Sequence, residues 1–249
     1  MTNIAEITEM TAASNKVDTV QQTVIESKSL CRHYGHGDTL VNALSDANLT
    51  IKKGEFTAII GPSGSGKSTL LQLIGGLDRP TSGDAFLDNK NISHMTGTEL
   101  SDFRRDHIGF IFQAYNLIPV LTAKEIIEYI MLLQGIPASE REKRVAMIMH
   151  AVGLEGLEER RPAELSGGQQ QRVAVARAMV SKPSIILADE PTANLDSKTG
   201  ADLLDMMKDL NEKQNMTFVF STHDPKIMER ARRIIRLVDG RIVDDERRD

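Results

Sequence analysis

The fold is decided by Phe56-Thr57-Ala58-Ile59-Ile60-Gly61-Pro62-Ser63-Gly64-Ser65-Gly66-Lys67-Ser68, in which an apolar run leads directly into a glycine-rich loop. Residues 56–60 are nearly all apolar, a pattern typical of a strand that is buried on both faces. Behind the loop, residues 70–74 carry leucine and isoleucine at helical spacing, and Gly75-Gly76 ends this run. The sequence therefore predicts a buried strand, a tight loop and a helix in direct succession.

The loop has the composition of a phosphate-binding site. Residues 61–68 follow the pattern G-x-x-x-x-G-K-[ST], which arises by chance in roughly one chain in a hundred of this length. A loop between a buried strand and a helix points backbone N–H groups, and the positive end of the helix dipole, at one place. There, Lys67 supplies a mobile positive charge for the β- and γ-phosphates, and Ser68 offers a hydroxyl to Mg²⁺. The predicted nucleotide-binding residues are Gly61, Pro62, Ser63, Gly64, Ser65, Gly66, Lys67, Ser68 and Thr69.

Two adjacent carboxylates end a second apolar run, at residues 184–188. Asp189 and Glu190 would repel each other unless they share a cation or a water network. Asp189 fits the role of a Mg²⁺ ligand, and Glu190 fits the residue that orients and polarises an attacking water. An alternative is that the pair merely caps a helix, with Pro191 in its first turn.

A second glycine-rich element, Leu165-Ser166-Gly167-Gly168-Gln169, lies about a hundred residues after the first. Val173, Ala176 and Val180 follow it at helical spacing, so the element is another helix N-terminus that can face an anion. A simple helix cap would explain Ser166 but gives no reason for Gly-Gly-Gln.

The remaining sequence predicts an α/β protein with a mainly parallel core sheet. Apolar residues alternate over 24–31 and 47–51, as in an antiparallel sheet with one covered face, whereas strands alternate with helices after Ser166, which requires crossover connections. We expect a disordered leader over residues 1–22 and one ATPase domain over 23–249. Within it we expect a core with an N-terminal antiparallel β subdomain over about 23–94 and 166–249, and an inserted helical subdomain over about 95–165.

Composition argues against several other classes of protein. The 249 residues carry a formal net charge of −5, and their basic residues form no stripe interleaved with aromatics, so we expect no nucleic-acid partner. The basic cluster Arg232-Arg233, Arg236 and Arg241 is mixed with acids, and we interpret it as a solvated face. No apolar run approaches the roughly 18 residues that cross a bilayer. The first residues lack the pattern of a secretory signal, which predicts a cytosolic chain.

Taken together, these residues resemble the nucleotide-binding domains of ATP-binding cassette (ABC) transporters, which are P-loop NTPases. The resemblance covers roughly residues 25–243. The family's elements occur in order: Walker A at 61–68, a Q-loop glutamine at Gln113, the signature at 165–169, Walker B at 184–189, Glu190, a D-loop that ends at Asp196, and a switch histidine at His223. The resemblance implies an ATPase that takes ATP and Mg²⁺ as ligands.

The resemblance also implies roles that the residues alone do not. Tyr34 stands where the family places an aromatic that stacks on adenine, although an ordinary edge tyrosine is the alternative. Gln113 would link Mg²⁺ and water to the helical subdomain, and His223 would hydrogen-bond the γ-phosphate. Asp196 would lie at the contact between two copies of the chain. In the family, the signature of one copy caps the γ-phosphate of ATP held by the other, which assigns this role to Ser166, Gly167, Gly168 and Gln169.

Within the family, residues 109–119 and 190–196 look like the lipoprotein-releasing and macrolide-export subgroup of LolD and MacB, except that Ala193 stands where this subgroup usually has glycine. The subgroup implies an integral-membrane permease as a separate partner, a location at the cytoplasmic face of the inner membrane, and docking of the permease near residues 113–133. A cell-division cassette that transmits force without moving a substrate is one alternative. A soluble cassette acting in DNA repair or on ribosomes is another, disfavoured because the chain has one cassette, no long coiled-coil insertion and an acidic balance.

Overall fold

The computed structural model describes residues 22–248, apart from the side chain of Asp38. The leader expected over residues 1–22 therefore lies almost wholly outside the described residues. The strands are β1 (Thr23–Tyr34), β2 (Val41–Lys52), β3 (Phe56–Ile60), β4 (Ser82–Leu87), β5 (Lys90–Asn91), β6 (Ile108–Ile111), β7 (Ile185–Asp189), β8 (Phe218–Thr222), β9 (Arg233–Val238) and β10 (Arg241–Arg247). The helices are η1 (Gly37–Thr39), α2 (Lys67–Ile74), α3 (Gly97–His107), α4 (Ala123–Leu133), α5 (Ala138–Ala151), η2 (Pro162–Glu164), α6 (Gly167–Met179), α7 (Ser197–Gln214) and α8 (Pro225–Arg230).

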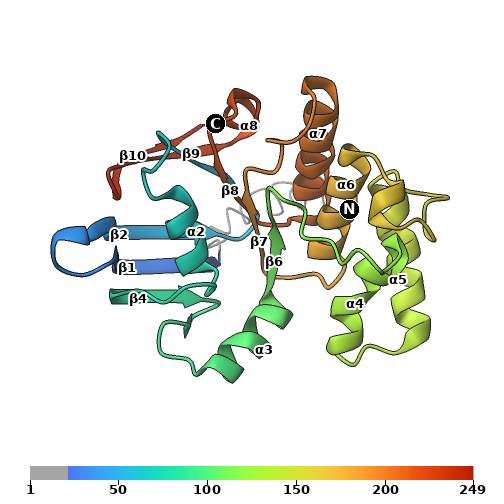
Figure 1. Ribbon diagram of the computed structural model, residues 1–249, viewed down its shortest axis with the longest axis horizontal. Coiled ribbons are helices and arrows are strands. Elements are labelled where there is room, and N and C mark those ends of the chain that lie inside the picture. Colours follow the sequence, from blue (N-terminus) through green and yellow to red (C-terminus); the bar gives the residue numbers. More distant parts are fainter. Residues whose placement is uncertain (1–21, 249) are drawn as a thin grey trace, which may run out of the picture.

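The strands form two sheets (Figure 1). The first is antiparallel, with the order β2-β1-β4-β5. The second has the order β10-β9-β3-β8-β7-β6; its strands β9, β3, β8, β7 and β6 are parallel, and β10 alone pairs in the antiparallel sense. The α/β fold with a mainly parallel core sheet and an N-terminal antiparallel sheet, predicted from the sequence, is therefore confirmed.

Both faces of the parallel sheet are covered, which is why its strands are apolar throughout. Along β3, the side chains of Phe56, Ala58 and Ile60 pack with α6 and α7, whereas Ile59 packs on the other face with α2 and the antiparallel sheet. All five residues of β3 are buried. The strand that leads into the phosphate loop is thus held at the centre of two hydrophobic cores.

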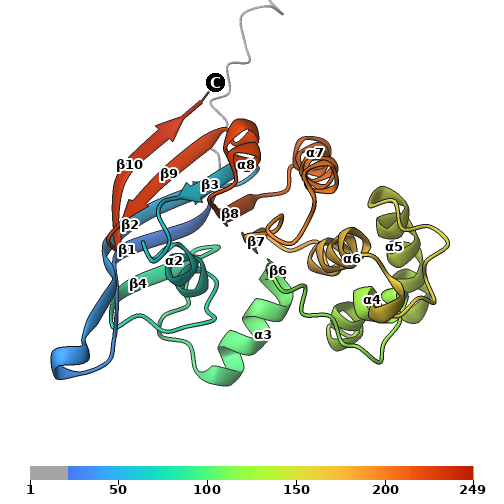
Figure 2. The same cartoon turned by 45° about the horizontal axis from the view of Figure 1, so that its top comes forward.

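The helices α4, α5 and α6 share a third hydrophobic cluster, and Figure 2 shows them beside the central sheet on the side of β6. Strand β6 lies inside the range 95–165 that we expected to be helical, yet it pairs with β7 in the central sheet. The reason is that a run of only four apolar residues has no periodicity that distinguishes a buried strand from a buried helix. Helix α3, which precedes β6, likewise packs into the core beside α2 through Leu100 and Phe103.

Among residues 22–248, no helix combines the length and the apolar character that crossing a bilayer requires.

Strand β6 and helix α6 pack so closely at Gly109 that a substitution there tests the contact. A Cβ atom at Gly109 would lie 2.2 Å from the carbonyl oxygen of Ala178, so Gly109→Ala should force the helix away from the strand and destabilise the protein by about 1–3 kcal/mol. Urea unfolding measures this change. Gly97→Ala is the matched control, because nothing lies within 4 Å of its new methyl group. Equal free energies of unfolding for the two variants would contradict the packing described here.

Candidate functional site

The glycine-rich loop bends tightly between β3 and α2. Gly66 has φ 98°, and a Cβ atom there would lie 2.3 Å from the carbonyl oxygen of Ala43, so no other residue fits without displacing the backbone. Lys67, the first residue of α2, is buried, and its Nζ donates hydrogen bonds to the carbonyls of Gly61 and Pro62, both at 2.9 Å. The loop thus curls around its own lysine, whose charge lies where the helix N-terminus is also positive.

A cleft of about 560 Å³ opens above this loop. Its lining combines Ser63, Gly64, Gly66, Lys67, Ser68 and Thr69 with Glu190, Val41, Asn42, Ala43 and Asp239. The last four have no signal in the sequence, because β2 and the turn after β9 carry no motif. The backbone N–H of Gly240 in that turn donates to the carbonyl of Ser65 at 3.0 Å, which ties the turn to the phosphate loop.

The hydroxyl of Ser68, in the first turn of α2, meets the carboxylate of Asp189 at the end of β7. Ser68 Oγ donates to Asp189 Oδ1 at 3.0 Å, although the two residues are 121 positions apart in the sequence. A hydroxyl and a carboxylate are hard oxygen ligands of the kind that Mg²⁺ prefers. No cluster of three or more His, Cys, Asp or Glu side chains within residues 22–248 is arranged to hold a metal ion. Mg²⁺ does not need such a cluster, because it takes most of its ligands from water and substrate phosphates.

Glu190 and His223 form a pair beside this bond. His223 Nδ1 lies 2.6 Å from Glu190 Oε1, and Thr222 Oγ1 donates to Glu190 Oε2 at 3.1 Å. The backbone of Glu190 is left-handed, with φ 45°, a conformation that a residue with a Cβ adopts at a cost. Both carboxylate oxygens are therefore oriented by the end of β8. The contribution of Thr222 had no signal in the sequence.

Gln113 and Asp196 lie on the segments that flank the signature. Gln113 follows β6 and is exposed, and its backbone carbonyl accepts a hydrogen bond from Asn194 Nδ2 at 2.8 Å. Asp196 is the N-cap of α7 and accepts from the N–H groups of Lys198 and Thr199, both at 3.0 Å. Hydrogen bonds from Thr199 hold the pKa of Asp196 below its ordinary value.

The signature begins α6. Ser166 is the N-cap: its Oγ accepts from the N–H of Gln169, and Gln169 Oε1 accepts from the N–H of Ser166 at 2.9 Å. The remaining N–H groups of this first turn point out of the helix end. None of residues 165–169 lines the cleft that holds Lys67 and Glu190. The structure therefore gathers Walker A, Asp189, Glu190 and His223 into one site and leaves the signature outside it.

Tyr34 lies at the end of β1, in register with Val41 of the cleft. Its hydroxyl donates to Asp78 at 2.8 Å, and the guanidinium of Arg32 lies 4.4 Å from the centre of its ring. Arg32 in turn makes two hydrogen bonds to Asp78, at 2.8 and 3.0 Å. One face of the ring is thus covered by a cation, and the ring remains partly exposed. No local pattern in the sequence signals this contact between Arg32 and Asp78, because the two residues are 46 positions apart.

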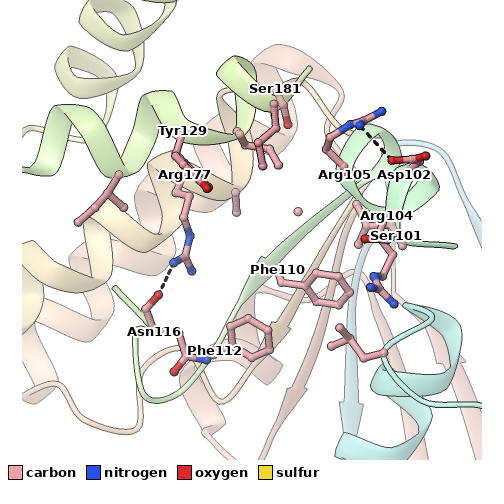
Figure 3. A pocket seen from close by; sticks show the side chains of 17 residues that line it. Ser101, Asp102, Arg104, Arg105, Phe110, Phe112, Asn116, Tyr129, Arg177 and Ser181 are labelled. Carbon is pink, nitrogen blue, oxygen red and sulfur yellow. Dashed lines mark hydrogen bonds and ion pairs between the residues drawn. The ribbon is translucent and has the colours of Figure 1, made fainter. Parts of the chain in front are cut away.

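A second cavity, of about 590 Å³, lies between α3, β6, α4 and α6 (Figure 3). Apolar and aromatic side chains provide much of its lining, among them Leu77, Phe110, Phe112, Tyr129, Ile130 and Leu133. Arginines stand at its walls, and Figure 3 shows Arg177 of α6 pointing toward Asn116. The cavity therefore combines apolar side chains with Arg104, Arg105 and Arg177, and Arg105 is paired with Asp102 (Figure 3).

Comparisons with known proteins agree with this geometry. The ABC transporter family matches residues 44–193. An uncharacterized ABC transporter ATP-binding protein of Methanocaldococcus jannaschii, MJ0796, is 46% identical over 228 residues, which cover 90% of this chain and 97% of that protein. The macrolide export ATP-binding/permease protein MacB of Escherichia coli is 46% identical over 222 residues, which are 89% of this chain but 34% of MacB. This chain thus spans about a third of MacB.

Solved structures give the same result. A dimeric structure of the ATP-binding cassette MJ0796 in a post-hydrolysis state, bound to ADP and Pi, superimposes with a TM-score of 0.83 at 44% identity and covers 90% of this chain and 98% of that one. A structure of cbiO1 from Clostridium perfringens, part of the transporter complex cbiONQ, gives a TM-score of 0.81 at 29% identity. On the strength of the family match and of a near full-length relative, this chain belongs to the ABC transporter family, as an ATP-binding cassette with ATPase activity.

Proposed function

We propose that two copies of this chain close around two molecules of Mg-ATP and hydrolyse them to drive a separate permease at the cytoplasmic face of the inner membrane. One observation carries the proposal: a single chain assembles the phosphate loop, Asp189, Glu190 and His223, but places the signature on a different helix, outside the cleft. A second copy would supply the part of the site that one chain lacks.

In this proposal, the triphosphate lies along the loop from Gly61 to Thr69. Lys67 exchanges its loop carbonyls for β- and γ-phosphate oxygens, and the N–H groups at the start of α2 donate to the same phosphates. Ser68, Asp189 and Gln113 would hold Mg²⁺; the support is the contact between Ser68 and Asp189 and the oxygen ligands that all three side chains offer. When bound, the ion would supply positive charge beside the transferred phosphoryl group. Adenine stacks on the uncovered face of Tyr34.

Glu190 accepts a proton from the attacking water and orients it toward the γ-phosphate, while His223 donates a hydrogen bond to that phosphate. The support for these roles is the pair itself: the carboxylate is fixed by Thr222 and by His223 at the mouth of the cleft. A carboxylate held in this way needs little reorganisation when water is activated.

The signature of the partner copy, Ser166 to Gln169, would cap the γ-phosphate. Its capped helix end presents N–H groups to an anion, and Asp196, which caps α7 on the same side of α6, would lie at the contact between the copies. The dimeric structures of MJ0796 support the pairing of two copies. After hydrolysis, the bridging charge between the copies falls and the dimer reopens.

The permease would dock in the cavity between α3, β6, α4 and α6, which adjoins the segment after Gln113. Support comes from its exposed apolar side chains, such as Tyr129 and Leu133, because large exposed apolar patches mark interaction sites. The relative MacB, a macrolide export ATP-binding/permease protein, supports an export role. A lipoprotein-releasing role of the LolD type rests on the resemblance of residues 109–119 and 190–196 to that subgroup. In this proposal the permease, and not the cassette, selects the cargo.

Glu190→Gln should leave ATP binding intact, lower the rate of hydrolysis by about 10²- to 10⁴-fold and accumulate a closed dimer, because the amide cannot accept the proton of water. Phosphate release measures turnover, and size-exclusion chromatography with ATP measures the dimer. Glu142→Gln, at an exposed position of α5, serves as the control and should retain activity. Near-normal hydrolysis by Glu190→Gln would disprove the role of Glu190.

Ser166→Arg should inactivate mixed dimers in which the other copy is unaltered, because the arginine blocks the γ-phosphate site of the opposite copy. Two affinity tags in sequence isolate the mixed dimer, and its ATPase rate is then compared with that of the unaltered dimer. Ser139→Arg, exposed in the first turn of α5, is the control for an added arginine. A fully active Ser166→Arg mixed dimer would show that the signature does not act across the interface.

Leu133→Asp should reduce the amount of integral-membrane partner that co-purifies in detergent by at least about tenfold, which corresponds to about 1.4 kcal/mol of binding free energy. The partner is identified by mass spectrometry after purification of the unaltered cassette from membranes. Val243→Asp on β10 is the matched control, because Val243 is 56% exposed and Leu133 is 51% exposed. Equal recovery of the same permease with both variants would place the docking surface elsewhere.

A further inference from the structure

The turn that follows β6, residues 113–116, has an unfavourable backbone conformation that contacts from another element must stabilise. Tyr115 and Asn116 have φ 58° and 49°, so two consecutive residues with side chains are left-handed. Such a conformation brings Cβ close to the backbone and is rare outside glycine. Within the turn, the N–H of Tyr115 donates to the carbonyl of Phe112 at 3.2 Å, and the N–H of Asn116 donates to the carbonyl of Ala114 at 2.6 Å.

Arg177 of α6 binds the backbone carbonyls of Tyr115 and Asn116. One terminal nitrogen of its guanidinium donates to the carbonyl of Asn116 at 2.5 Å (Figure 3). The other donates to the carbonyl of Tyr115 at 3.2 Å. The planar fork of a guanidinium can hold two acceptors in one fixed geometry, which the ammonium of lysine cannot do. The left-handed turn is therefore fixed by one side chain from another element.

Among residues 22–248, no carboxylate forms an ion pair with Arg177, whose side-chain hydrogen bonds go to backbone carbonyls. Burial lowers the pKa of its guanidinium. A half-buried cation of this kind depends on the carbonyl dipoles that it binds. The two hydrogen bonds thus stabilise the arginine as much as they stabilise the turn.

The other end of the same helix also contacts the turn. Gly167 is the first residue of α6, and a Cβ atom built there would lie 3.1 Å from the hydroxyl oxygen of Tyr115. Residue 115 therefore meets α6 twice: its carbonyl binds Arg177 near the end of the helix, and its phenol lies against the signature at the start. Gln113, two residues earlier, is held to the D-loop through Asn194.

We infer that Arg177 is a positioning residue that fastens the 113–116 turn to α6, so that Gln113 and the signature move as one unit. The inference rests on the proposed function, since it takes Gln113 and the signature to contact nucleotide. Arg177 does not line the nucleotide cleft and acts through the backbone of the turn. Its loss should therefore affect the rate of hydrolysis and not the binding of ATP.

The test measures kcat and KM for Mg-ATP with the full chain. Arg177→Met should lower kcat at least about tenfold, because small misplacements of a reacting constellation are costly, whereas KM should change by less than about threefold. The kcat of Arg177→Lys should lie between those of the unaltered chain and Arg177→Met, because an ammonium can bind one of the two carbonyls more easily than both. Arg172→Met is the control from the same helix: Arg172 donates to the carbonyl of Val152 at 2.7 Å, away from the turn, and kcat should stay within about twofold.

A rescue variant separates positioning from general stability. Asn116→Gly added to Arg177→Met should restore kcat at least about threefold, because glycine adopts the left-handed conformation without a Cβ clash. An unchanged kcat in Arg177→Met would overturn the inference, as would an equal loss in Arg172→Met or a loss that glycine does not relieve. If Arg177→Met does not fold, Arg177→Lys with and without Asn116→Gly decides by the same criteria. Failure of the unaltered chain to hydrolyse Mg-ATP would instead refute the proposed function.

Discussion

Parallel pairing of β3, β8 and β7 is the constraint on which the rest of the structure depends. In this register Ile60 lies opposite Thr222, and Asp189 lies opposite Ser221. Parallel strands end at the same edge of a sheet, so the segments that follow them emerge side by side. The phosphate loop, the two carboxylates and the switch histidine are far apart in the sequence and become neighbours only through this pairing. The burial of both faces of the sheet holds the register, because a shift by one residue would exchange the two cores.

Much of this arrangement was predictable from the residues. The strand–loop–helix unit at 56–74 was found because its apolar run, its glycines and its helical spacing each have a separate physical signal. Strand β7 (Ile185–Asp189) was predicted within one residue, as the apolar run at 184–188, for the same reason. Strand β6 was not, because four apolar residues between helices carry no period. The interpretation of Arg233 as part of a solvated face was wrong: it is buried, and its guanidinium pairs with Glu55 and Asp245.

The parts of the site that the sequence could not predict are those made by contacts between distant segments. Asp239 reaches the cleft from a turn after β9, and Thr222 orients Glu190, yet neither residue belongs to a pattern that local chemistry defines. The same holds for Arg32 and Asp78 behind Tyr34, and for Arg177 behind the 113–116 turn. Sequence motifs identify the residues that contact a ligand. The side chains that orient those residues come from distant segments and are brought into place by tertiary packing.

The two hydrogen bonds of Lys67 to its own loop have a consequence for the thermodynamics of the catalytic cycle. Because the ammonium is already satisfied by the carbonyls of Gly61 and Pro62, the arrival of phosphates replaces hydrogen bonds and adds few new ones. The net free energy gained by such an exchange is small compared with the gain when phosphate binds an ammonium that has no partner. The lysine is therefore satisfied by either set of partners. In the proposed cycle, spent nucleotide can depart because the lysine regains its earlier partners as the phosphates leave.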